Sequence, residues 1–204
     1  RMLFKHIKQF IAPDILDIPV KLLLQFLLLA LLTKQEFAII SLGMLFFSYS
    51  PFGQLGTLDY LMLKLPERYV SDTLLDSHRE LALSRSIVNF VVLFFGICIV
   101  FFLIYSNQDF LLIIAFLAYI IQSFFYQKYL YRTIILRYSY NLEYLFKLKI
   151  TLSLTRLVFS TLGLYFFGIY GYLLSESFIY IVPIILFPKH GITNFSNSNS
   201  NSNK

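Results

Sequence analysis

Ile87-Val-Asn-Phe-Val-Val-Leu-Phe-Phe-Gly-Ile-Cys-Ile-Val-Phe-Phe-Leu-Ile-Tyr105 is an apolar run of nineteen residues without an acidic or basic side chain. A helix that crosses the hydrocarbon core of a bilayer needs about 20 mostly apolar residues, because each residue adds about 1.5 Å to a core about 30 Å thick. The run therefore predicts a transmembrane helix, and the remaining chain is interpreted from it.

The composition supports a membrane protein throughout. The chain has 204 residues, of which 58% are hydrophobic and 14% are charged, and its mean hydropathy is +0.71. Soluble domains carry about 25% charged residues, so this chain lacks the polar surface of a water-soluble globule. The net charge of +6 comes from basic residues spread between apolar runs. That spacing indicates membrane topology and contact with lipid, and it argues against a nucleic-acid partner.

Five further apolar runs resemble the first, which predicts an all-α, polytopic bundle of six transmembrane helices. The second run is longer than a straight crossing needs, so it is expected to tilt, kink or protrude. In chain order the six predicted spans are 15–32, 37–65, 87–105, 110–126, 150–167 and 170–187.

The positions of Lys and Arg predict the orientation. They precede the first span, lie between the second and third and between the fourth and fifth, and follow the sixth, whereas the alternate connections hold only Lys34. Basic connections stay on the cytoplasmic side. Six crossings with both termini in the cytoplasm follow, and we expect a multi-pass protein of the cell inner (cytoplasmic) membrane. No small-residue cleavage site follows the first run, so no cleavable signal peptide is expected.

Two long cytoplasmic connections and the tail complete the predicted organisation. Residues 71–85 place apolar side chains on one helical face, which predicts an interfacial helix. Residues 127–149 alternate apolar and basic side chains, which is explained either by ordinary basic anchoring to anionic lipid or by helix extensions against the headgroups. Residues 1–190 are expected to form the six-helix bundle, and the Ser/Asn-rich residues 191–204 a disordered tail.

Ionisable residues within the predicted spans are the candidates for function. A charge at the bilayer centre costs about 2.5 to 3.5 kcal/mol, so each needs a partner, a wet cavity or a route to the interface. For Lys21 and Arg156, snorkelling to the interface and facing a cavity are equally open. Asp17, Lys21 and Gln25 form one stripe at i, i+4 and i+8, facing protein or a cleft, with an Asp17–Lys21 pair as the structural alternative. Glu176 should be protonated, paired or in water.

A break in the second run suggests a moving element. Pro51, Gly53 and Gly56 remove a helix donor and loosen the backbone, and they are predicted as a hinge. Asp59 lies nearly one turn beyond Gly56, where a structural bond to a freed backbone amide explains it at least as well as a substrate contact.

Motifs for catalysis are missing. The sequence has neither a phosphate-binding loop nor a nicotinamide fingerprint, and its three histidines (His6, His78, His190) and one cysteine (Cys98) lack metal-ligand spacing. We expect no enzyme activity, catalytic residue, cofactor or metal. Three glycines near the end of the fifth span are instead predicted to serve close helix contacts and a tight turn: Gly163, Gly168 and Gly171.

Two segments resemble a known family. Leu32-Thr-Lys-Gln-Glu-Phe-Ala-Ile-Ile-Ser-Leu and Gln54-Leu-Gly-Thr-Leu-Asp-Tyr-Leu-Met-Leu-Lys-Leu-Pro-Glu-Arg-Tyr are similar to the first two helices of bacterial polysaccharide-unit (O-antigen or capsule) flippases of the multidrug, oligosaccharidyl-lipid and polysaccharide exporter superfamily. Thr33 and Lys34 stand where the family has Gly-Pro in the turn, and Ala38 stands where it has Gly. The second segment keeps the family's Leu-Pro-x-x-Tyr-like pattern.

The resemblance implies a transporter of two six-helix bundles that flips an undecaprenyl-diphosphate-linked oligosaccharide for lipopolysaccharide or capsule synthesis. This chain corresponds to the N-terminal bundle, so a missing C-terminal lobe or a second copy is implied as partner. A cationic cavity would take the anionic substrate, with Lys21 and Arg156 as cations and Gln25 and Glu176 beside them. The alternatives are a drug or other small-molecule exporter, a nonfunctional remnant, and a membrane enzyme, which the short external connections disfavour.

Overall fold

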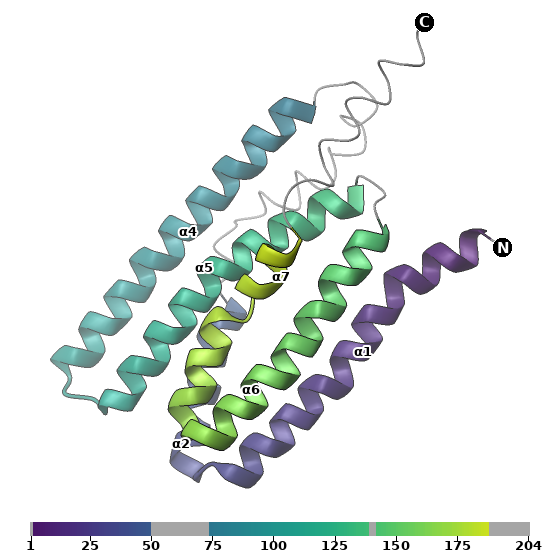
Figure 1. Ribbon diagram of the computed structural model, residues 1–204. Helices are drawn as coiled ribbons and strands as arrows, with labels where there is room; N and C mark the ends of the chain where they lie inside the picture. The colour runs from purple at the N-terminus through teal and green to yellow at the C-terminus, as the bar shows by residue number, and fades with distance from the viewer. Residues whose placement is uncertain (1, 50–73, 139–141, 188–204) are drawn as a thin grey trace, which may run out of the picture.

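The apolar run at 87–105 forms the greater part of α4 (Leu74–Tyr105) in a computed structural model of the chain (Figure 1). The structure describes residues 2–49, 74–138 and 142–187. No glycine or proline stands between Leu74 and Phe95, so the helix runs without a break from the predicted interfacial segment into the predicted span. The helical state of 74–85 was predicted correctly, but its separation from the span was wrong.

Membrane character is supported by three segments. Within the described residues, three helical segments are long and apolar enough to cross a membrane: Ala82–Tyr105, Phe110–Arg137 and Leu142–Leu186. This indicates a membrane protein. Helices α1 (Met2–Leu31) and α2 (Lys34–Tyr49) fall outside the set, because α1 carries three charges near its apolar half and α2 has only 16 residues. The count of six crossings and the side on which the termini lie stay predictions.

The third segment folds back on itself at Gly168. Helix α6 (Leu142–Phe178) has non-helical dihedral angles there, with φ 59° and ψ −142°, a region that only glycine enters without strain. The Ser175 hydroxyl donates to the carbonyl of Phe159 at 3.0 Å, which joins two antiparallel arms across the turn. The predicted tight turn is thus confirmed, and it separates the predicted fifth and sixth spans.

The second arm of α6 is interrupted at Ile179 and Tyr180 before α7 (Ile181–Leu186) begins. Pro183 explains the break. It has no N–H to donate to the carbonyl of Ile179, and its ring would collide with that carbonyl in a continuous helix. The predicted single helix over 170–187 is therefore wrong in this detail.

Two other turns between helices are stabilised by local capping motifs. Asn107 lies just beyond the end of α4 and has a left-handed φ of 50°. The Asn107 N–H donates to Ile104 O at 3.1 Å, and the Gln108 N–H donates to Leu103 O at 3.1 Å. These two bonds form a Schellman motif. At the start of α2, the Thr33 N–H donates to the Glu36 carboxylate at 2.9 Å, and the Glu36 N–H contacts Thr33 Oγ1 at 3.3 Å, which is a capping box.

These turns share one end of the bundle. Figure 1 shows the α1–α2 turn, the α4–α5 turn and the Gly168 turn at the end opposite the start of α1. The Gln35 side chain donates to Asp109 at 3.0 Å and so links the first two turns. These three turns are the connections predicted to be external, and the side of the membrane on which they lie stays a prediction.

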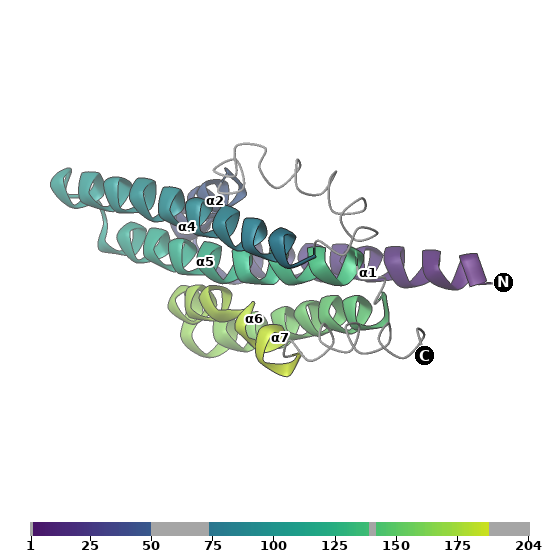
Figure 2. The same ribbon diagram turned by 90° about the horizontal axis from the view of Figure 1, so that it is seen from above.

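Helix α5 (Phe110–Tyr138) is central and contacts α2, α4, α6 and α7. Figure 2 shows α6 and α7 on one side of it and α4 and α2 on the other. Both α5 and α6 extend beyond the predicted spans, to Tyr138 and from Leu142, so the described residues of 127–149 are helical, while their contact with headgroups stays a prediction. Helix α1 packs mainly on α6. Gly43 of α2 lies against the ring of Tyr119, leaving no room for a Cβ atom.

Candidate functional site: a cavity lined by intramembrane charges

An ion pair joins the two arms of α6. Arg156 lies in the first arm and Glu176 in the second, and the Gly168 turn sets their register so that Arg156 Nε lies 3.6 Å from Glu176 Oε1. Only 11% of the Arg156 side chain and 7% of the Glu176 side chain are exposed. Of the two alternatives left open for Arg156, the structure shows the inward one. Glu176, expected to be protonated, paired or in water, is paired.

The polar stripe of α1 faces this pair. Lys21 Nζ lies 2.6 Å from Asp17 Oδ2, and Asp17 Oδ1 accepts a hydrogen bond from Ser153 at 3.0 Å and lies 3.9 Å from Arg156 Nη1. Asp17 therefore faces protein, Lys21 and Gln25 border a cavity, and the Asp17–Lys21 pair given as the alternative forms as well. Lys21 itself keeps 59% of its side chain uncovered by protein.

Three uncharged side chains complete the network. Gln122 of α5 donates to Glu176 Oε2 at 2.8 Å, and Ser160 donates to Glu176 Oε1 at 2.9 Å. Arg156 Nη2 donates to the Tyr180 hydroxyl at 3.1 Å, where the helix break places that ring. Sequence reasoning missed these residues. Gln122 carried a usable signal, since it stands with Ser123 in the otherwise apolar run of the fourth span.

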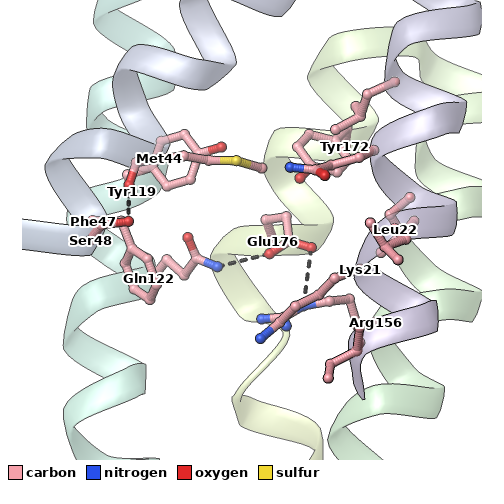
Figure 3. A pocket seen from close by; sticks show the side chains of 14 residues that line it. Lys21, Leu22, Met44, Phe47, Ser48, Tyr119, Gln122, Arg156, Tyr172 and Glu176 are labelled. Atoms are coloured by element: carbon pink, nitrogen blue, oxygen red, sulfur yellow. Dashed lines mark hydrogen bonds and ion pairs between the residues drawn. The ribbon is translucent and has the colours of Figure 1, made fainter. Parts of the chain in front are cut away.

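The network borders a cavity of about 460 Å³. Figure 3 shows α1 on one side of it and α2 and α5 on the other, with Arg156, Gln122 and Glu176 pointing toward one another. All four residues predicted to bind substrate line this cavity: Lys21, Gln25, Arg156 and Glu176. They come from α1 and from both arms of α6, so the fold brings together residues up to 155 positions apart. Their role in binding stays a prediction.

The rest of the wall is apolar or aromatic. Ile18, Leu22, Leu24 and Leu28 line it from α1, and Met44 and Phe47 line it from α2, while Tyr119 and Tyr172 add two rings. Both tyrosines are 2% exposed. The cavity thus joins a strip of charged and amide groups to a broad apolar surface.

Several predicted features fall elsewhere. The proposed hinge residues Pro51, Gly53 and Gly56, together with Asp59 and the 191–204 tail, lie outside the described residues. Across 2–49, 74–138 and 142–187, no three His, Cys, Asp or Glu side chains are grouped so that they could hold a metal ion.

No protein-family model, curated protein or solved structure matches the chain.

Proposed function

We propose that this chain forms one bundle of a flippase that moves an undecaprenyl-diphosphate-linked oligosaccharide from the cytoplasmic to the outer leaflet of the inner membrane, for surface polysaccharide synthesis. The observation that carries the proposal is the convergence of Lys21, Gln25, Arg156 and Glu176 on one cavity. Ionisable side chains within membrane helices are rare, and they mark substrate or ion pathways, proton relays and ligand counter-ions. Flipping neither makes nor breaks a covalent bond, so the proposal assigns no catalytic residue.

The character of the wall supports an amphiphilic substrate. One side of the cavity is formed by aliphatic side chains of α1 and the other by the Gln122–Glu176–Arg156 network. A lipid-linked sugar presents the same two surfaces, an apolar chain and a polar head. Small-molecule sites occupy about 300–1,000 Å³, a range that includes this cavity. The cavity lies between helices, where a change in helix packing would open it to either side of a membrane.

A reconstitution experiment tests the proposal. The purified chain in liposomes would be supplied with a fluorescent polyprenyl-diphosphate-linked disaccharide, and transfer to the outer leaflet would be followed by quenching with a membrane-impermeant reagent. We expect transfer above that of protein-free liposomes, and a reduction of about tenfold in Lys21→Ala. A matched control is Lys147→Ala, since Lys147 forms the same i,i+4 ion pair with Glu143, at 2.7 Å, but does not line the cavity.

The outcomes separate the alternatives. Transfer no faster than in protein-free liposomes would contradict the flippase proposal for this chain. Accumulation of a cationic dye in the same liposomes, without transfer of the lipid-linked sugar, would favour the exporter alternative. A protein that folds but does neither would correspond to the remnant.

A further inference from the structure

The charged side chains of the cavity wall are paired. Lys21 and Arg156 bring two positive formal charges to the wall and Glu176 brings one negative charge, while Asp17, which does not line the cavity, lies beside Lys21. Each cation on the described wall already lies beside a carboxylate, Lys21 at 2.6 Å from Asp17 and Arg156 at 3.6 Å from Glu176. A ligand that displaced Glu176 from Arg156 would leave a buried carboxylate without its partner, which is strongly unfavourable.

Two uncharged groups beside the cavity keep open hydrogen-bonding capacity. Glu176 accepts hydrogen bonds, so Gln122 must turn its amide nitrogen toward the carboxylate and its oxygen away from it. That oxygen, and the hydroxyl of Tyr119, are buried and have no hydrogen-bond partner within the described part of the chain. A buried amide oxygen without a donor is costly, and a ligand hydroxyl would remove that cost.

Aromatic faces lie beside these groups. Phe47, Tyr119 and Tyr172 line the same cavity as Gln122 (Figure 3). A pyranose ring has hydroxyl groups around its edge and apolar C–H faces, so it matches both the open acceptor and the rings. A diphosphate has acceptors only. It offers no donor to the Gln122 oxygen and no apolar face to the aromatic side chains.

We infer that the cavity binds an uncharged sugar residue, whose hydroxyl groups bond to the Gln122 side-chain oxygen and the Tyr119 hydroxyl. The inference rests on the flippase proposal and deepens it, because it names the residues that contact the sugar.

Equilibrium binding to the purified chain in phosphatidylcholine nanodiscs tests this with two probes. One probe is an isoprenyl glycoside with a neutral disaccharide and no phosphate, and the other is a polyprenyl diphosphate with no sugar. We expect the glycoside to bind, with affinity about three- to tenfold weaker in Tyr119→Phe and in Gln122→Met, as for the loss of one hydrogen bond. The same substitutions should leave binding of the diphosphate unchanged.

The following controls distinguish a folding defect from a binding defect. Tyr119→Phe removes only a hydroxyl and keeps the ring against Gly43, so it should fold like the parent chain. Ser123→Ala is the matched control for Gln122, because Ser123 is buried on the same helix but does not line the cavity, and its glycoside affinity should equal that of the parent. The melting temperature of each variant in nanodiscs checks its folding.

Three results would overturn the inference: no binding of the glycoside, an equal loss of diphosphate binding in Tyr119→Phe and Gln122→Met, or parental glycoside affinity in both variants. The transfer assay with the complete lipid-linked disaccharide is independent of these results. Glycoside binding without transfer would refute the flippase proposal and leave the sugar site intact, whereas transfer without glycoside binding would do the reverse.

Discussion

Gly163 in the first arm of α6 lies against Gly171 in the second, so close that a Cβ atom on either residue would overlap the backbone of the other. The contact lies five residues before the Gly168 turn on one arm and three after it on the other. It brings the two arms together and so sets the spacing of Arg156 and Glu176 farther along the hairpin.

Substitution of Gly171 tests that contact. Gly171→Ala must push the arms apart, and we expect a loss of about 1–3 kcal/mol in the free energy of unfolding, as for other overpacked contacts. The melting temperature of the purified protein in detergent measures it. Leu174→Ala is the control, because Leu174 lies on the same arm with 67% of its surface uncovered by protein. An unchanged melting temperature in Gly171→Ala would show that the arms do not meet here.

The Arg156–Glu176 pair should behave as a unit. Arg156→Met or Glu176→Gln alone leaves one buried charge without its partner, which costs about 3–5 kcal/mol. The double variant removes both charges and should recover most of that loss. A double-mutant cycle of unfolding free energies measures the coupling, and simple additivity of the two single losses would contradict a direct pair.

Arg132 should hold α7 in place. Its Nη1 donates to Ile184 O at 2.6 Å and also to Phe187 O, so it satisfies carbonyls at the end of α7. In Arg132→Met we expect faster amide hydrogen exchange in residues 184–187, by the equivalent of about 1.5–3 kcal/mol.

Lys128→Met is the matched control for Arg132. Lys128 lies one turn earlier on α5, but its ammonium contacts the rings of Phe124 and Phe125 at 5.0 and 5.6 Å instead of α7. Exchange in α7 should be unaffected in this variant. Equal acceleration in both variants would mean that α7 responds to any change on that face of α5.

The capping box at the start of α2 should contribute to stability. Thr33→Ala removes the hydroxyl that contacts the Glu36 N–H, and we expect a loss of about 1 kcal/mol, whereas Thr33→Ser should keep most of the parent's stability. Chemical unfolding in mixed micelles compares the two. Lys34→Ala, at the neighbouring exposed position, should change the unfolding free energy little.

Much of the helical layout could be predicted from the sequence, because apolar runs of membrane-spanning length and their polar interruptions are local signals. The turns at 33–36, 106–109 and Gly168 all fall where the pattern placed them. The merging of 74–85 with α4 was missed because an amphipathic pattern does not show where a helix stops. The break before α7 was missed although Pro183 signals it.

Of the residues at the site, the sequence predicted mainly those that are ionisable. Lys21, Arg156 and Glu176 were conspicuous because ionisable residues are costly in a membrane helix, and they do line one cavity. The Asp17–Lys21 pair had a local i,i+4 signal, whereas the Arg156–Glu176 pair depends on the α6 hairpin and the Arg156–Asp17 contact on how α1 packs on α6. Those two contacts, and the parts played by Tyr119 and Gln122, therefore required the fold.

The Gly168 hairpin also bears on how the chain enters the membrane. Arg156 and Glu176 are twenty positions apart and meet within one hairpin, so each finds its counter-charge as soon as the second arm emerges from the ribosome. Inserted separately, each would carry a charge into hydrocarbon at a cost of about 2.5–3.5 kcal/mol. Inserted together, the arms leave the translocon as one neutral unit, before any other helix is needed.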